Sequence, residues 1–192
     1  MRRPEFLLAT YVTLVAIILD GVLSLATTIL TPATPSDGDF GWMMSLLLGN
    51  LCCAVVAAAW LIRAGQIARA DSADHLIYSP WGRVLWFFVP IFCLFKPFQG
   101  MRELWNVAHG NAAHSDSQWV VNSWWGATLA SGTLGLFFSL VNGINNPLPL
   151  ALTIVLGLVG VTQSGLSLWI SWAIGSRLAK GIGDRQLAQV FA

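Results

Sequence analysis

The chain has 192 residues, of which 56% are hydrophobic and 10% are charged, and its formal net charge is +1. Ordinary soluble domains carry about 25% charged residues, so this composition excludes a soluble protein of the same length. The balanced charge also argues against nucleic acid as a partner, because nucleic-acid-binding proteins usually show a basic excess. We expect one domain over residues 1–192, an all-α integral membrane protein.

Two long apolar stretches open the chain. The first covers residues 6–30 and contains one charged residue, Asp20. A helix of that length rises about 38 Å, which is enough to cross a bilayer with tilt. The second covers residues 42–62 without a charge and follows a loop rich in Pro, Gly and Asp. Loops of this composition break helices, so both stretches are predicted as separate membrane-spanning helices.

The segment at residues 81–109 is apolar but is too short to cross a membrane. Its uncharged part, Val84–Phe95, falls short of the roughly 20 residues that a spanning helix needs. Pro90 interrupts it, and Pro97 suits the first position of a following helix. We predict a Pro-broken segment that is re-entrant or interfacial, followed by an amphipathic helix that ends near His109.

A long uncharged run forms the second half of the chain. It extends from Ser117 to Ser176, and the turn-like cluster NGINNPLP at Asn142–Pro149 divides it. We therefore predict a third span at 119–141 and a fourth at 150–175, which gives four transmembrane helices.

The distribution of the ten basic residues decides between four crossings and five. If residues 84–95 crossed the membrane, the basic residues would be divided evenly between its two sides. If this segment enters and returns, all ten lie on one side. The positive-inside rule favours the second arrangement and makes that side cytoplasmic, together with both chain termini.

Small residues recur at every fourth position on two of the predicted spans. Such stripes let helix backbones approach closely in lipid, which favours association within the chain or with another subunit. The candidate packing residues are Ser45, Gly49, Cys53 and Ala57 on the second span and Ala127, Ser131, Gly135 and Ser139 on the third.

Asp20 is the most informative single residue, because it lies near the middle of the first span. An acid at that depth costs about 2.5–3.5 kcal/mol and normally faces a partner or a cavity. Asn50 and Gln163 are predicted at similar depth on the second and fourth spans. Two interpretations stay open: a proton or cation site, or a protonated carboxyl that bonds to Gln163 or to backbone and fixes the helix register.

A second set of polar candidates, Lys96, Arg102 and Glu103, is predicted on the cytoplasmic face. These residues could bind a small ligand or an anionic lipid headgroup. Alternatively they anchor the segment at the interface, with the two basic side chains extending to the headgroups.

Metal and cofactor chemistry has little support in the sequence. Cys52, Cys53 and Cys93 lack CxxC spacing, the histidines form no His-x-x-x-His pair, and no predicted span contains a histidine. No Gly-rich phosphate loop or hydrolase motif is present. We expect no metal, no cofactor and no enzymatic activity.

Four short motifs cluster between Tyr78 and Trp105. They are Tyr78-Ser79-Pro80, Trp86-Phe87-Phe88-Val89-Pro90-Ile91, Lys96-Pro97-Phe98-Gln99 and Met101-Arg102-Glu103-Leu104-Trp105. This stretch resembles the domain-of-unknown-function 4328 family of small helical membrane proteins of bacteria. Arg83 departs from the pattern, because a small or apolar residue is expected there. The resemblance implies a bacterial inner-membrane protein and carries over no catalytic residue.

Two functions are compatible with these features. The first is a non-catalytic scaffold or accessory subunit of the inner membrane, with lipids and other membrane subunits or a second copy as partners. The alternative is a small permease or channel that uses Asp20, Asn50 and Gln163. The surroundings of Asp20 discriminate between them: dry packing against Gln163 favours the scaffold, and a water-filled path favours transport.

Overall fold

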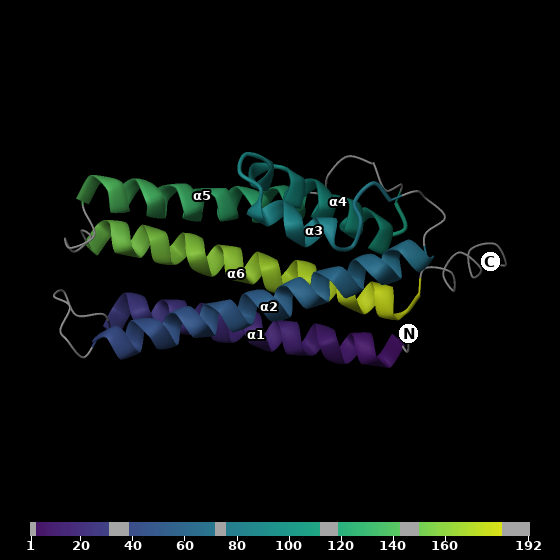
Figure 1. Cartoon of the computed structure of the whole chain (residues 1–192), viewed down its shortest axis with the longest axis horizontal. Coiled ribbons are helices and arrows are strands. Elements are labelled where there is room, and N and C mark those ends of the chain that lie inside the picture. Colours follow the sequence, from purple (N-terminus) through teal and green to yellow (C-terminus); the bar gives the residue numbers. More distant parts are fainter. Residues whose placement is uncertain (1–2, 31–38, 72–75, 112–118, 143–149, 182–192) are drawn as a thin grey trace.

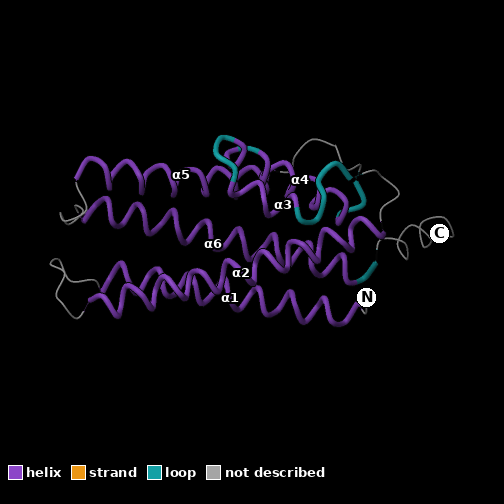
Figure 2. The backbone as a smooth tube through the Cα atoms, in the orientation of Figure 1, coloured by secondary structure: helices purple, strands orange, loops and turns teal. Residues whose placement is uncertain are grey.

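The computed structural model describes residues 3–30, 39–71, 76–111, 119–142 and 150–181. Within these ranges every regular element is a helix, and no strand is present (Figure 2). The predicted all-α class is confirmed. The four long helices are α1 (Arg3–Leu30), α2 (Asp39–Asp71), α5 (Trp119–Asn142) and α6 (Leu150–Ala179).

The long helices run alternately in opposite directions along one bundle (Figure 1). Helix α1 packs against both α2 and α6, and α6 packs against α5. As a result, α1 begins and α6 ends at the same end of the bundle (Figure 1). At that end α1 and α6 touch closely, since a Cβ added at Gly175 would lie 2.6 Å from Thr10 Oγ1.

The well-buried side chains gather in the half of the bundle where α1 begins. Phe6 of α1 stacks on Trp60 of α2, with 6.4 Å between the ring centroids. The Trp60 indole Nε1 donates to Thr10 Oγ1 at 3.1 Å, and Thr10 Oγ1 donates to the Phe6 carbonyl at 3.0 Å. Further buried apolar residues at this end are Ala64, Leu104, Val121, Ile170, Ile174 and Leu178.

A broken segment between α2 and α5 covers this buried half. It consists of α3 (Gly82–Leu85), η1 (Trp86–Phe88), η2 (Phe92–Leu94) and α4 (Lys96–Ala108). Its two arms are bent by 118° relative to each other, and Ile91 in the bend has a φ of 68°. The Trp125 indole Nε1 of α5 donates to the Leu94 carbonyl at 2.8 Å. The segment therefore folds back and lies beside α5 (Figure 1).

Three of the described helices, α1, α2 and α6, are long and apolar enough to cross a membrane. A fourth candidate arises only if the bent pair Gly82–Phe88 and Phe92–Ala108 is counted as one span. Helix α5 has 24 residues without a charged side chain, and part of its side chains lie outside the described structure. The described helices thus give three or four candidate spans by length and composition, and the assignment of α5 as a span stays a prediction.

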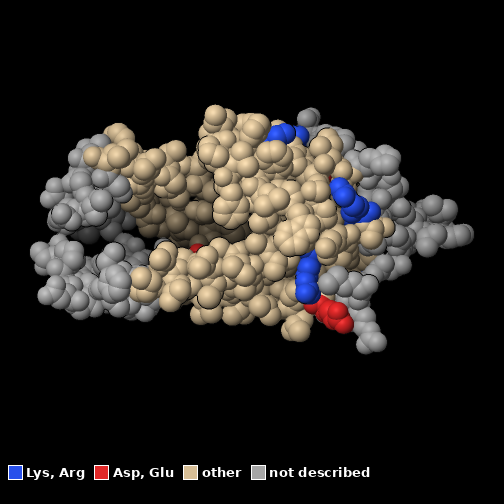
Figure 3. Space-filling view, in the orientation of Figure 1, with Lys and Arg blue, Asp and Glu red and all other residues tan. Residues whose placement is uncertain are grey.

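The charged groups are unevenly distributed over the molecule. Most of the surface in Figure 3 is uncharged, and the visible lysines and arginines lie toward the end at which α1 begins. This arrangement follows from the alternating helix directions, because the described basic residues fall in the first turn of α1, the last part of α2, the broken segment and the end of α6.

Candidate functional site

Two adjoining cavities between the long helices share Ile17, Asp20, Gln163 and Ser164. We call them together the Asp20 groove. The first cavity has a volume of about 400 Å³ and the second of about 620 Å³. Figure 3 shows the molecule hollowed between the upper and lower helices, with acidic surface inside the hollow.

The two cavities follow one another along α6. The first is lined on this helix by residues from Gln163 to Ser171, and the second by residues from Leu156 to Leu168. Asp20 of α1 lines both. The carboxylate therefore lies where the two cavities meet, roughly midway along the groove.

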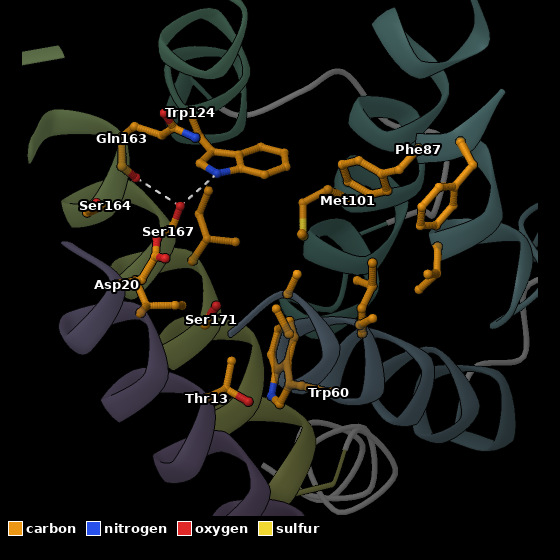
Figure 4. Close-up of a pocket in the computed structure, with 18 residues that line it drawn as sticks. Thr13, Asp20, Trp60, Phe87, Met101, Trp124, Gln163, Ser164, Ser167 and Ser171 are labelled. Atoms are coloured by element: carbon orange, nitrogen blue, oxygen red, sulfur yellow. Dashed lines mark hydrogen bonds between the residues drawn. The ribbon is translucent and has the colours of Figure 1, made fainter. Parts of the chain in front are cut away.

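One wall of the first cavity is polar. Its polar side chains are Thr13 and Asp20 from α1 and Gln163, Ser164, Ser167 and Ser171 from α6 (Figure 4). Ser167 Oγ donates to the Gln163 carbonyl at 2.8 Å and accepts from the Trp124 indole Nε1 at 3.0 Å. Among the side chains that the structure describes, none donates a hydrogen bond to the Asp20 carboxylate or forms an ion pair with it.

The opposite wall of the first cavity is apolar and largely aromatic. It contains Trp60 and Leu61 of α2, Phe87 and Phe88 of η1 and Met101 of α4. Figure 4 shows Phe87 and Met101 across the cavity from Asp20 and Ser167. A carboxylate facing aromatic rings across a cavity of this size can hold a positive charge on one side and an apolar body on the other.

The structure brings together two of the three intramembrane candidates. Asp20 and Gln163 line the same cavities, whereas Asn50 is exposed and lines neither. The hydroxyl groups of Ser167 and Ser171 were not among the predicted site residues. Their four-residue spacing from Gln163 was the available signal, because residues four apart share a helix face.

A second polar cluster lies inside the broken segment, around a buried ion pair. Arg83 Nη2 donates to Glu103 Oε2 at 2.5 Å, and both side chains are almost fully buried. The Glu103 carboxylate also accepts from the backbone N–H of Ile77 at 2.6 Å and of Tyr78 at 3.4 Å. Burial lowers the pKa of Arg83, and Glu103 opposes that shift. The guanidinium stays charged because its ordinary pKa is so high.

Glycines provide the space for this ion pair. A Cβ added at Gly100 of α4 would lie 3.3 Å from Arg83 Cγ, and one at Gly65 of α2 would lie 3.4 Å from Arg83 Nη1. The contact at Gly100 is tighter than ordinary packing, and the one at Gly65 is at the limit of it. The Arg83 side chain therefore packs against two backbones that carry no side chain at these positions.

The three predicted cytoplasmic-face candidates do not form one site. Glu103 pairs with Arg83, whereas Arg102 lies over the Phe98 ring at 5.8 Å from its centroid. Lys96 Nζ lies 3.4 Å from Tyr78 Oη and 5.4 Å from the centroid of that ring. The Tyr78 hydroxyl also donates to Gln99 Oε1. The motif residues thus contact one another and form a folded unit.

The predicted packing residues have varied surroundings. Cys53 Sγ of α2 donates to the Ala16 carbonyl of α1 at 3.4 Å. Ala57 lines the first cavity and Ser131 the second. The remaining residues are Gly49, Ala127 and Gly135, which are partly buried, and Ser45 and Ser139, whose side chains lie outside the described part of the structure.

Comparison with known proteins bears on the family of the chain. A search of curated proteins found no match, and a search of solved structures found none. The family model named Domain of unknown function (DUF4328) matches residues 40–162. This range covers more than half of the chain and includes both the Arg83–Glu103 pair and part of the Asp20 groove. The chain therefore belongs to the DUF4328 family.

Proposed function

We propose that this protein is a small permease of the bacterial inner membrane that moves a cation through the Asp20 groove. The observation that carries the proposal is the position of the Asp20 carboxylate. It lines two cavities that follow one another along the bundle, and none of the side chains that the structure describes donates a hydrogen bond to it.

The dimensions of the groove support this proposal. Its lining on α6 extends from Leu156 to Ser171, a rise of about 22 Å. The hydrocarbon core of a bilayer is about 30 Å thick. An uncompensated acid inside that core is costly, and a passing cation would compensate its charge. The helix ends that carry the basic residues would face the cytoplasm, together with both termini.

The proposal is tested by measuring charge movement in liposomes that contain the purified protein. Pulses of potassium, ammonium and organic cations are applied. We expect transient currents with wild type for at least one cation, and a loss of about tenfold or more in Asp20→Asn, because a charge-assisted contact is removed. Asp20→Glu should keep part of the current.

Glu5→Gln is the matched control for this experiment. It also removes a carboxylate from α1, but Glu5 is exposed in the first turn and lines neither cavity. Its current should equal that of wild type. Absence of current with every cation, or an unchanged current in Asp20→Asn, would contradict the permease proposal.

A second candidate function is a non-catalytic scaffold or accessory subunit, and the outer face of α5 favours it. Small or polar residues are exposed there, among them Ser123, Gly126, Gly132 and Thr133. Small residues allow a second helix to approach closely in lipid. Other membrane subunits or a second copy of this chain would bind along this face.

Purification in mild detergent followed by mass analysis tests the accessory function. A Cβ added at Gly126 meets nothing within 4 Å, so Gly126→Leu should leave the monomer folded while blocking a partner helix. Val55→Leu on the exposed face of α2 is the control. We expect a co-purifying subunit or a dimer that Gly126→Leu releases. A lone wild-type monomer would count against this function.

A further inference from the structure

We infer that the Asp20 groove binds a hydrophobic organic cation, with the charge at Asp20 and the apolar body against the aromatic wall of the first cavity. This inference rests on the proposed function, because it names the class of solute that the groove would carry.

The oxygen atoms that line the first cavity do not suit a bare inorganic cation, because they are few and lie on one side. Calcium and magnesium require six or more oxygen ligands around the ion. The first cavity offers the Asp20 carboxylate and a few hydroxyl and amide groups, all on one wall. No cluster of three or more His, Cys, Asp or Glu side chains suited to a metal occurs in the described part of the chain. A single carboxylate matches a single positive charge on a larger molecule.

The aromatic lining of the first cavity fits the rest of such a molecule. Trp60, Phe87 and Trp124 present aromatic rings to the cavity, and aromatic faces attract cations within about 6 Å. The volume of about 400 Å³ falls in the range of roughly 300–1,000 Å³ that is usual for small-molecule sites.

Two of these rings are held in place before any ligand arrives. The Trp60 indole donates to Thr10 Oγ1 at 3.1 Å, and the Trp124 indole donates to Ser167 Oγ at 3.0 Å. Because these rings are already fixed, less conformational entropy is lost when a ligand binds, and the affinity is higher. The aromatic lining of the cavity is therefore preorganised from two helices, with Trp60 of α2 on the apolar wall and Trp124 of α5 beside Ser167.

The groove is also open toward the side of the bundle. Figure 3 views the molecule from the side and shows the hollow exposed on this face. Phe88, which lines the first cavity, is 79% exposed. In a bilayer this opening would face lipid, where a hydrophobic cation accumulates and a hydrated inorganic ion does not. A hydrophobic cation is therefore the solute that can reach Asp20 from the lipid, through the side opening of the groove.

Equilibrium dialysis of the full-length protein in detergent tests the inference. The probe is labelled tetraphenylphosphonium, and triphenylphosphine oxide is its neutral counterpart. We expect saturable binding of the cation by wild type and at least about tenfold weaker binding by Asp20→Asn. Asp20→Glu should bind more tightly than Asp20→Asn, and Glu5→Gln should match wild type. The neutral compound should bind more weakly, and equally to wild type and Asp20→Asn.

Phe87→Ala tests the aromatic wall separately. Phe87 is 44% exposed, so its truncation should weaken binding severalfold while leaving the melting temperature unchanged. Lack of saturable binding by wild type, or equal affinity in Asp20→Asn, would overturn the inference. Potassium currents without tetraphenylphosphonium binding would refute the organic-cation site and leave the permease function standing. Tetraphenylphosphonium binding without any current would support the site and refute the permease function.

Discussion

At the scale of single residues, Arg83 explains why the Tyr78–Trp105 stretch folds as it does. The family resemblance predicts a small or apolar residue at this position. In the structure its charge is buried against Glu103, whose carboxylate also binds the backbone of residues 77 and 78. One acidic side chain of α4 thereby fixes both the start of the broken segment and the orientation of α3.

Glu103→Gln should therefore destabilise the protein by about 3–5 kcal/mol, because it leaves a buried guanidinium without its counter-charge. Thermal unfolding of the purified protein in detergent measures the effect. Adding Arg83→Met to Glu103→Gln should recover most of the loss, because it removes the unpaired buried charge while the amide oxygen at position 103 still accepts from the Ile77 N–H.

Arg102→Gln is the control, because Arg102 is next to Glu103 in sequence but only partly buried. It should change stability by no more than about 0.5 kcal/mol. Equal melting temperatures for wild type and Glu103→Gln would show that the pair does not stabilise the broken segment.

At the scale of elements, the contact between α1 and α6 organises the bundle. The two helices approach closely where Thr10 meets Gly175, and further along they carry the polar wall of the groove. The stripes predicted from sequence lie on α2 and α5 instead. A small residue at helical spacing is common in membrane helices, so the spacing alone could not identify which glycine meets a neighbour.

Gly175→Ala should separate α1 from α6 and destabilise the protein by about 1–3 kcal/mol, as overpacking does. The shift would also disturb the bond from Trp60 to Thr10 Oγ1. Melting temperatures in detergent measure the loss. Gly126→Ala is the matched control on α5, where an added Cβ meets nothing within 4 Å. It should be neutral or slightly stabilising, and an equal loss in both variants would refute the close contact.

At the scale of the whole molecule, the distribution of basic residues matches the directions of the helices. The alternating helices place the described basic residues toward the end at which α1 begins and α6 ends. The broken segment lies in that half of the bundle, against α5. This arrangement is the one expected for four crossings with a re-entrant or interfacial segment, and the membrane sides themselves stay a prediction.

Cysteine labelling on both sides of the broken segment tests that topology. In a background without Cys52, Cys53 and Cys93, Ile77→Cys and Asn111→Cys place thiols at two exposed positions. Both should resist an impermeant maleimide in intact spheroplasts and react after lysis. Ser36→Cys, in the loop before the second predicted span, should react in intact spheroplasts. Opposite accessibility of positions 77 and 111 would establish a fifth crossing instead.

Composition and patterning were enough to predict the all-helical class, the approximate helix bounds and apolar helices long enough to cross a membrane. These features depend on the content and length of uncharged runs, which are properties of the linear chain. The position of Asp20 inside the first apolar helix follows from the same pattern, and its role stays a proposal. The family resemblance was likewise carried by local motifs, and the match over residues 40–162 confirmed it.

Which side chains meet depends on how the helices pack in three dimensions. It paired Glu103 with Arg83 rather than with Lys96 or Arg102, and it placed Gln163 but not Asn50 with Asp20. Depth in a span can be counted along a sequence, but the rotation of one helix against another cannot. That rotation is set by close contacts such as Thr10 with Gly175, and it determines which polar groups face the groove.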